Sequence, residues 1–312
     1  MQGLIAVILT YNEAPNLRRC LESVRGLCPI YVVDSGSTDA TVALAQEYGA
    51  VVQINPYQNH ATQWQWALEH LPPECQWVLA LDADFAVSQA LTQQIRQRLH
   101  HLPEQVAGIY VRHFYHFGGG KIRFGGTKHY WLRLVRRDRA RADLSDLVDF
   151  RFIVQGSTQN WTGCVEEYNV HDDDLSLWLA KQDKFALRLA VEEELRRRRL
   201  LGWQGQARLW GNPDQRIMWL RDRWLHLPLF LRPVLYFGYR YFLMGGWLDG
   251  RAGFLYHFLQ GFWLRVAVDW KIRELRQLAL DDTAIQAFRT QMLTTRTGSV
   301  RQVYATLAPP TP

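Results

Sequence analysis

Short apolar runs rich in β-branched residues alternate with amphipathic stretches along the first hundred residues. Four of these runs, at residues 4–9, 30–33, 51–54 and 77–81, are predicted to be buried strands. Between them Leu, Val, Ala and Trp recur at helical spacing, which predicts helices that connect the strands. Strands and helices that alternate in this way form parallel βαβ units, whose ligands bind beyond the carboxyl ends of the strands.

The pattern changes after residue 105. Residues 107–115 and 129–135 are predicted strands on either side of a glycine-rich segment, so this half of the sheet is expected to be mixed. A long helix is predicted from about residue 176 to 200, because Trp, Phe and Leu form one stripe along it.

Aromatic residues and arginines are interleaved between residues 203 and 270, where the chain holds seven Trp, four Tyr and six Phe. Charged residues interrupt every window of the ~20 apolar residues that a membrane-spanning helix needs. Prolines and the Gly245–Gly246 pair break this region into short amphipathic helices, and Trp, Tyr and Arg favour the lipid headgroup layer. We expect the region to lie on a bilayer, and a helical subdomain packed on the rest of the chain is the alternative.

Charge is unevenly distributed along the chain of 312 residues, whose net charge is +6. Residues 1–105 carry five basic and ten acidic side chains, a net charge of −5, so the remaining residues carry +11. A basic, aromatic second part favours a polyanionic or membrane-surface partner. Nucleic acid is not expected, because the first part is acidic and no DNA- or RNA-binding module is recognisable.

Cysteine usage and the first residues bear on the compartment. The four cysteines show neither CxxC pairing nor a framework spacing, so metal clusters and secreted disulfide scaffolds are not expected. The chain starts with a strand-like run and lacks a basic segment followed by a cleavable apolar stretch, so we expect no signal peptide. A cytoplasmic location is therefore predicted.

Three polar clusters follow predicted strands, at residues 10–13, 34–39 and 82–84. The carboxyl ends of parallel strands share one edge of a sheet, so the three clusters are expected to converge on one crevice. Asp82 and Asp84 end a buried apolar run, where desolvating two carboxylates is costly. A divalent cation would offset that cost, and a turn or helix cap is the alternative for this pair.

The three clusters resemble the motifs of a known family. Residues 7–13 (VILTYNE), 32–39 (VVDSGSTD) and 81–84 (LDAD) are similar to those of the inverting family 2 glycosyltransferases, in the family's order and usual spacing. The resemblance implies the α/β GT-A fold, a Rossmann-like mixed sheet flanked by helices, and a nucleotide-sugar donor. It is strongest over about the first hundred residues and points to the membrane-associated lipopolysaccharide-core and polysaccharide branch.

The resemblance implies a role for each matching position. The positions that would line the nucleotide pocket are Thr10, Tyr11 and Glu13. Asp34 would hydrogen-bond the base, Asp82 would contact the ribose or a metal, and Asp84 would bind Mg²⁺ or Mn²⁺ through the diphosphate. Hard oxygen ligands suit these cations, and a cation neutralises charge that develops on a departing diphosphate.

A histidine just before a Trp-containing helix completes the metal or diphosphate site in the branch that this chain resembles. His171 precedes the predicted helix that carries Trp178, so we predict this role for His171, with a structural loop histidine as the alternative. The adjacent Asp173 and Asp174 are interpreted as helix N-caps.

An inverting transfer needs a base that takes the proton of the acceptor hydroxyl. In the family that this chain resembles, a carboxylate between the DxD pair and the late histidine does this. We predict Asp149 first and Asp146 second, with Glu166 and Glu167 as further candidates. Surface carboxylates paired with nearby arginines are the alternative for each of them.

The predicted organisation follows from these assignments. The GT-A catalytic domain comprises residues 1–105 (nucleotide-binding half), 106–175 (acceptor half) and 176–200 (long helix), followed by the membrane-associating helical region 201–293 and a flexible tail 294–312.

The sequence predicts a metal-dependent inverting glycosyltransferase with UDP-glucose as the first-choice donor. The predicted acceptor is a lipid-linked or cell-envelope glycan, and the predicted location is the inner face of the cell membrane, as a peripheral protein. One alternative is a catalytically silent scaffold that binds nucleotide sugars at the membrane. The other is a sugar nucleotidyltransferase, whose glycine- and lysine-rich activating loop is replaced here by residues 10–13.

Overall fold

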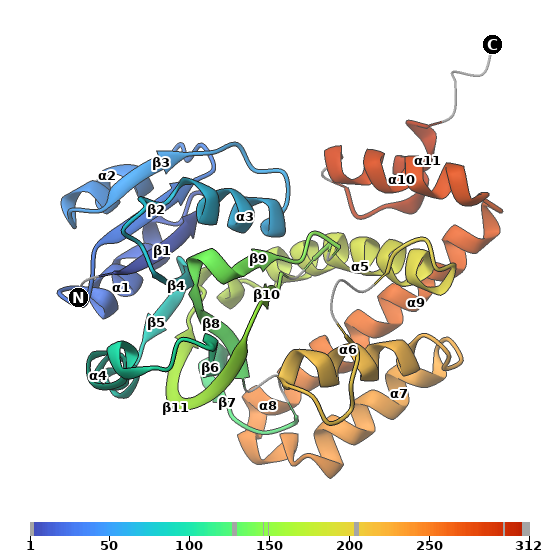
Figure 1. Cartoon of the computed structure of the whole chain (residues 1–312). Coiled ribbons are helices and arrows are strands. Elements are labelled where there is room, and N and C mark those ends of the chain that lie inside the picture. Colours follow the sequence, from blue (N-terminus) through green and yellow to red (C-terminus); the bar gives the residue numbers. More distant parts are fainter. Residues whose placement is uncertain are drawn as a thin grey trace. The chain divides into compact units, whose positions relative to one another are not determined.

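The computed structural model describes residues 3–126, 130–145, 147–148, 150–202, 206–295 and 297–307. These residues divide into two compact units (Figure 1). The sheet unit runs to residue 170, except that residues 124–126, 145 and 147–148 belong to the helical unit, which continues from residue 171. The division falls before the long helix, which differs from the domain boundary predicted at residue 200.

A mixed sheet forms the centre of the sheet unit, with nine strands among its described residues. Their bounds are β1 Leu4–Thr10, β2 Ile30–Asp34, β3 Val51–Ile54, β4 Trp77–Asp82, β5 Phe85–Val87, β6 Val106–Phe117, β7 Gly120–Ile122, β8 Tyr130–Arg136 and β11 Ser157–Glu167. The order is β3-β2-β1-β4-β8-β6-β11-β5, and β7 pairs with β6. Strands β1 to β4 are parallel to one another, whereas β8 is antiparallel to both β4 and β6. The predicted change from a parallel to a mixed half is confirmed.

Helices cover both faces of this sheet, as the continuous apolar runs predicted. One face packs on α1 (Ala14–Val24), α2 (Thr41–Glu47) and α4 (Gln89–Arg98). The other packs on α3 (His60–His70) and on the small hairpin of β9 (Ala140–Ala142) and β10 (Phe152–Val154). All seven residues of β1 are buried, because its alternate side chains enter both cores.

The helical unit has its own apolar core, formed by helices that are distant in sequence. Its helices are α5 Leu175–Arg197, α6 Pro213–Trp224, α7 Leu231–Gly238, α8 Gly250–Tyr256, α9 Leu264–Gln277, α10 Asp282–Thr294 and α11 Val300–Ala305, with π-helical turns at Tyr239–Leu243 and His257–Trp263. Helices α5, α9, α10 and α11 enclose the core. A search of the described helices finds none whose length and hydropathy would let it span a bilayer.

The tail predicted at residues 294–312 contains a helix. Residues 300–305 form helix α11, and Val300 and Val303 are buried in the core of the helical unit. Two apolar side chains three positions apart share one helix face, so their burial stabilises this short helix. Residues 308–312 lie outside the described part of the chain.

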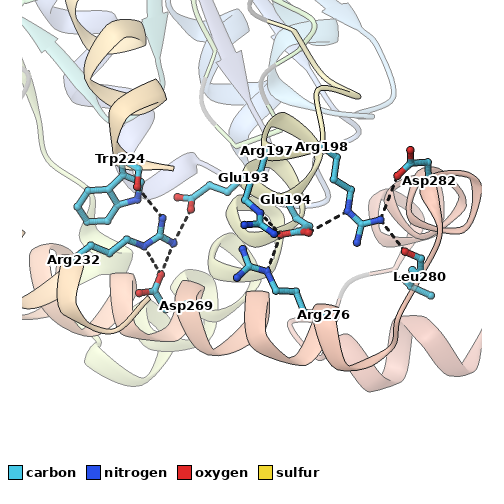
Figure 2. A network of polar contacts seen from close by, with 10 residues as sticks. All are labelled: Glu193, Glu194, Arg197, Arg198, Trp224, Arg232, Asp269, Arg276, Leu280 and Asp282. Carbon is cyan, nitrogen blue, oxygen red and sulfur yellow. Dashed lines mark hydrogen bonds and ion pairs between the residues drawn. The ribbon is translucent and has the colours of Figure 1, made fainter. Parts of the chain in front are cut away.

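Two ion networks cross-link the helical unit (Figure 2). Arg232, 1% exposed, donates to Asp269, pairs with Glu193 at 2.7 Å and lies over the Trp224 ring. Burial raises the pKa of Glu193 even though Arg232 opposes that rise.

The second network centres on the buried Glu194. Its carboxylate accepts from Arg198 and Arg276, both at 3.1 Å, and Arg198 also donates to the Leu280 carbonyl. Each buried charge in these networks therefore has a partner within the helical unit.

Candidate active site

The carboxyl ends of the neighbouring strands β2, β1 and β4 meet at one edge of the sheet, as the sequence predicted. Thr10 ends β1 and stands opposite Asp34 at the end of β2, while Leu9 stands opposite Asp82 at the end of β4. The Thr10 hydroxyl donates to Asp34 Oδ1 at 2.7 Å. The strand register therefore brings together the polar clusters on which the prediction depended.

Asp34 organises the loop that follows β2. Its side chain is fully buried, and Oδ2 accepts from the backbone N–H groups of Gly36 at 2.9 Å and Ser37 at 2.7 Å. The Ser37 hydroxyl donates to Oδ1 at 2.5 Å. Gly36 has φ +90°, a conformation that disfavours any residue with a Cβ. The predicted contact between Asp34 and a nucleotide base stays a prediction.

The loop after β1 is tied to the loop after β2. Asn12 adopts φ +54°; its N–H donates to the Ser37 hydroxyl, and its Oδ1 accepts from the Thr38 N–H at 2.8 Å. Tyr11, between these anchored residues, is 47% exposed. The loops after β1 and β2, which we call the crossed loops, are therefore joined by hydrogen bonds. They carry the Tyr11 ring, which is exposed to solvent.

Asp82 lies between a histidine and an arginine that the sequence analysis did not identify. Its Oδ1 is 3.2 Å from His60 Nε2, and its Oδ2 is 3.5 Å from Arg133 Nη2. Burial would raise the pKa of Asp82, but His60, Arg133 and His113 together hold that pKa below its ordinary value. Asp82 is therefore an anion at neutral pH.

Arg133 is held in an aromatic cage. Its guanidinium carbon lies 4.6 Å from the ring centre of Phe85, 4.5 Å from Trp131 and 5.1 Å from Phe150, and the residue is 1% exposed. Burial lowers the pKa of Arg133, although the nearby carboxylates of Asp82, Glu167 and Asp84 oppose this. The sequence signal was a single charge within the apolar run of β8.

A chain of amide side chains connects Asp84 to the loop after β1. Asn169 Nδ2 donates to Asp84 Oδ2 at 3.0 Å, and the Tyr168 N–H donates to the Asp84 carbonyl at 2.8 Å. Asn16, 2% exposed, donates to Glu13 at 2.7 Å and accepts from the Val170 N–H at 3.0 Å. Asn16 Nδ2 donates to Asn169 Oδ1 at 3.5 Å. The two asparagines therefore connect Glu13 and Asp84, the two carboxylates that are predicted to bind ligands.

Glu166 and Glu167 end strand β11 in different surroundings. Glu166 accepts from Lys121 at 2.8 Å and Tyr168 at 2.7 Å and lies 2.8 Å from His116. Burial opposes ionisation, but these partners lower the pKa of Glu166 to about 2, which makes it a weak base. Glu167 pairs with the buried His113 at 3.0 Å.

The described structure does not bring the remaining predicted residues into the site. Asp146 and Asp149 lie outside the described residues. His171 is exposed and begins the helical unit, so its role in a metal or diphosphate site stays a prediction. Asp174 is the N-cap of α5 and accepts from the N–H groups of Ser176 and Leu177, which confirms its interpretation as a cap.

The carboxylates at the end of β4 fit a hard divalent cation. No group of three His, Cys, Asp or Glu residues within the described part of the chain forms a metal cage. Mg²⁺, however, is usually bound through one or two carboxylates together with substrate phosphates and water. Asp84, half-buried and anchored through Asn169, provides hard oxygen donors of this kind beside Asp82.

Residues 5–153 match the model of glycosyl transferase family 2. The matched segment runs from β1 into β10 and contains all three polar clusters. Residues 5–153, just under half of the chain, are therefore similar to the family 2 glycosyltransferases.

Curated relatives match part of the chain. The lipopolysaccharide core biosynthesis glycosyltransferase LpsC of Rhizobium meliloti is 34% identical over 162 residues, which are 50% of this chain and 59% of LpsC. The uncharacterized glycosyltransferase RC0292 of Rickettsia conorii is 41% identical over 95 residues, 30% of this chain and 33% of that protein. The matches thus span between a third and about three fifths of these relatives.

Solved structures show a more distant likeness. Staphylococcus aureus TarS (residues 1–349, with UDP-GlcNAc) is 11% identical, with a TM-score of 0.43, covering 88% of this chain and 92% of that chain. Glucosyl-3-phosphoglycerate synthase of Mycobacterium tuberculosis, with Mn²⁺, UDP-glucose and phosphoglyceric acid, is 16% identical, with a TM-score of 0.38, covering 61% and 79%.

Proposed function

We propose that this protein is a metal-dependent inverting glycosyltransferase that moves a sugar from a nucleotide diphosphate to a lipid-linked or cell-envelope glycan. One observation carries the proposal: Asp82 ends β4 and Asp84 follows it, beside the carboxyl ends of β1 and β2 and inside the segment that matches family 2. Such an edge of a parallel sheet is where α/β proteins bind nucleotides.

The crossed loops would bind the nucleotide. Tyr11 offers an exposed ring on which a base can stack. The hydrogen bond from the Asn12 N–H to the Ser37 hydroxyl fixes the backbone next to Tyr11. Asp82 is an anion fixed by His60 and Arg133, and its oxygens would accept from ribose hydroxyls. UDP-glucose remains our first-choice donor.

Mg²⁺ or Mn²⁺ would be held by Asp84, with Asp82 beside it. When bound with the donor, the cation would neutralise charge on the diphosphate leaving group. The role of this chain's residues is to fix the carboxylate: Asn169 orients Asp84 Oδ2, and Asn16 holds the loop on which Asn169 lies.

The acceptor hydroxyl must lose a proton as it attacks the anomeric carbon. We propose Asp149 as the base, with Asp146 second. The ion pairs of Glu166 disfavour that residue, because a carboxylate with a pKa of about 2 takes up protons poorly. Asp149→Asn should abolish turnover and leave nucleotide binding intact, whereas retained turnover would move the role to Asp146.

We further propose that the protein works at the cytoplasmic face of the cell membrane. The support is the relative named for lipopolysaccharide core biosynthesis and the basic, aromatic composition of residues 203–270. An acceptor of that class carries its glycan on a lipid, so the enzyme would meet it at a bilayer surface.

A nucleotide-release assay tests the activity. Wild type, Asp84→Asn and the control Asp138→Asn would be incubated with a panel of sugar nucleotides and membrane lipid, with Mg²⁺, Mn²⁺ or EDTA. Asp138 is exposed on a turn outside the site. We expect release from one donor that needs the cation and falls at least about a hundredfold in Asp84→Asn only.

Two outcomes would contradict the proposal. Metal-dependent nucleotide binding without release from any donor, with lipid acceptor extract present, would favour the silent scaffold. Release of pyrophosphate from a nucleoside triphosphate and a sugar phosphate would instead indicate a nucleotidyltransferase.

A further inference from the structure

Large apolar side chains are exposed together between α7 and the second π-helical turn. Leu243 is 79% exposed and Phe242 62%, and four neighbours in sequence are also open to solvent. We call these six residues the apolar surface: Phe242, Leu243, Trp247, Leu248, Phe254 and Leu255. Single exposed apolar residues are normal in proteins, but a contiguous group of this kind marks an interaction site.

Contacts around Tyr241 bring members of the apolar surface together. The ring of Tyr241 lies 5.1 Å from Phe242 and 5.8 Å from Phe254, measured between ring centres. Tyr241, Trp247, Phe254 and Leu255 also line one open hollow of about 560 Å³, together with Arg251. Four of the six members, Phe242, Trp247, Phe254 and Leu255, therefore lie around Tyr241 on the helical unit.

The charge pattern around this surface indicates its partner. Residues 231–263 contain only four Lys, Arg, Asp or Glu side chains, and two of these, Arg232 and Arg240, are buried. The longer segment 206–277 holds eleven Lys and Arg against five Asp and Glu. An apolar centre within a basic segment complements a bilayer with anionic headgroups, and Trp, Tyr and Arg are stable in its headgroup layer.

A short strap from another part of the chain is hydrogen-bonded to the turns that carry this surface. The Gly125 N–H donates to the Met244 carbonyl at 2.9 Å, and Arg240 Nε donates to the Gly125 carbonyl at 2.8 Å. The Phe124 N–H donates to Asp249 at 2.9 Å. The strap, residues 124–126, thus joins the π-helical turn before Met244 to the turn that ends at Asp249.

Only glycine fits at the centre of the strap. A Cβ at Gly125 would overlap the imidazole of His257, which is fully buried. Gly125 also has φ +82°. The strap therefore fixes the two turns that present Leu243 and Trp247.

We propose that the apolar surface docks in the headgroup layer of an anionic lipid bilayer, and that the strap holds it in the docking conformation. The inference rests on the proposed function only for the identity of the lipid-linked acceptor. Docking itself requires neither a donor nor turnover. It accounts for the exposure of six apolar side chains in a chain whose described helices include none able to span a bilayer.

Vesicle flotation with the full chain tests the docking surface. The probes are vesicles of phosphatidylethanolamine with phosphatidylglycerol, and vesicles of phosphatidylcholine alone. Phe242→Ser/Leu243→Ser should weaken binding to the anionic vesicles at least about tenfold, since two large side chains lose their burial. The matched control is Val51→Ser/Ile54→Ser, an exposed apolar pair on the edge strand β3 of the sheet unit, which should bind like wild type.

A second pair of variants tests the strap. Gly125→Ala should weaken vesicle binding, whereas Gly119→Ala should not, because Gly119 has a similar φ of +76° but open space where its Cβ would lie. Adding His257→Ala to Gly125→Ala removes the overlapping ring and should restore part of the binding. UDP binding by each variant reports whether the sheet unit is still folded.

The proposal is overturned if wild type does not float with anionic vesicles, or if the Phe242/Leu243 variant floats as well as wild type. Self-association that disappears in that variant, without vesicle binding, would place a second copy of the chain on this surface instead. Vesicle binding in a protein that releases no nucleotide would leave docking standing and reject the proposed activity, so the two failures are distinguishable.

Discussion

Buried charges in the two units have different surroundings. In the helical unit, Arg232 and Glu194 are surrounded by partners of opposite sign, and these partners close two networks (Figure 2). In the sheet unit, Asp82 contacts His60 and Arg133 at 3.2 and 3.5 Å, and Asp84 is only half-buried. The first arrangement joins helices, whereas the second leaves two carboxylates partly exposed at the end of a strand.

On the proposed function, this difference separates charges that stabilise the fold from charges that would bind a ligand. A closed network gains stability from its own partners, and removing one member leaves a buried charge without compensation. An open pair gains most when a ligand arrives, so its removal should alter binding more than folding. Variants in each unit can therefore be compared by whether they change ligand binding or the free energy of unfolding.

The largest effect is expected for Arg232→Met. It leaves the buried Asp269 and Glu193 without their cation, and we expect a loss of about 3–5 kcal/mol in the free energy of unfolding. Urea unfolding followed by circular dichroism measures it. Arg197→Met, which removes a half-exposed arginine 3.7 Å from Glu194, should cost less than about 1 kcal/mol. Equal losses of unfolding free energy in the two variants would mean that burial does not determine how much each arginine stabilises the fold.

Glu166→Gln examines a closed cluster inside the sheet unit. The folded pKa of Glu166, about 2, lies below its ordinary 4.5, so its ionisation stabilises the fold above pH 4.5. That stabilisation, at most about 3 kcal/mol, is lost as the pH falls from 4.5 towards 2. Glu166→Gln should flatten the dependence of unfolding free energy on pH in this window, and the exposed Glu74→Gln should not. An unchanged slope would show that the cluster contributes nothing.

Asn169→Ala examines the open site. Residues that orient a metal ligand typically change metal affinity 10–100-fold, so we expect Mn²⁺ binding with UDP to weaken by about that factor. Calorimetry and the electron paramagnetic resonance signal of free Mn²⁺ measure it without turnover. The control is Asn160→Ala, an exposed asparagine on strand β11, which ends two residues before Asn169. A large loss of stability with unchanged Mn²⁺ affinity would make Asn169 structural.

The smallest effect is expected for Asp174→Ala. It removes the N-cap of α5, and such caps contribute about 1 kcal/mol. Thermal unfolding should show the loss, and Asp222→Ala, an exposed change within α6, should be neutral. If Asp174→Ala instead lowered donor affinity, the residue would belong to the site as well as to the helix.

Periodicity predicted the sheet well, because parallel strands buried on both faces leave continuous apolar runs such as residues 4–9. The clusters at Thr10, Asp34 and Asp82 were also predictable, since strand ends carry them to one edge. Local patterns could not join His60 and Arg133 to Asp82. The Arg133 contact depends on β8 pairing with β4 in one register, and the His60 contact depends on where the start of α3 lies. The boundary at residue 170 was missed because the apolar stripe of α5 does not reveal which core it enters.

The aromatic cage of Arg133 has a consequence for how this domain can change over time. Phe85, Trp131 and Phe150 come from three separate segments, yet each lies against the same guanidinium group. Replacing one ring alters the fit of the cation for the other two and for Asp82, so substitutions at these positions should be strongly non-additive. Evolution at this site would then proceed through coordinated replacement of the cage, with single changes selected against.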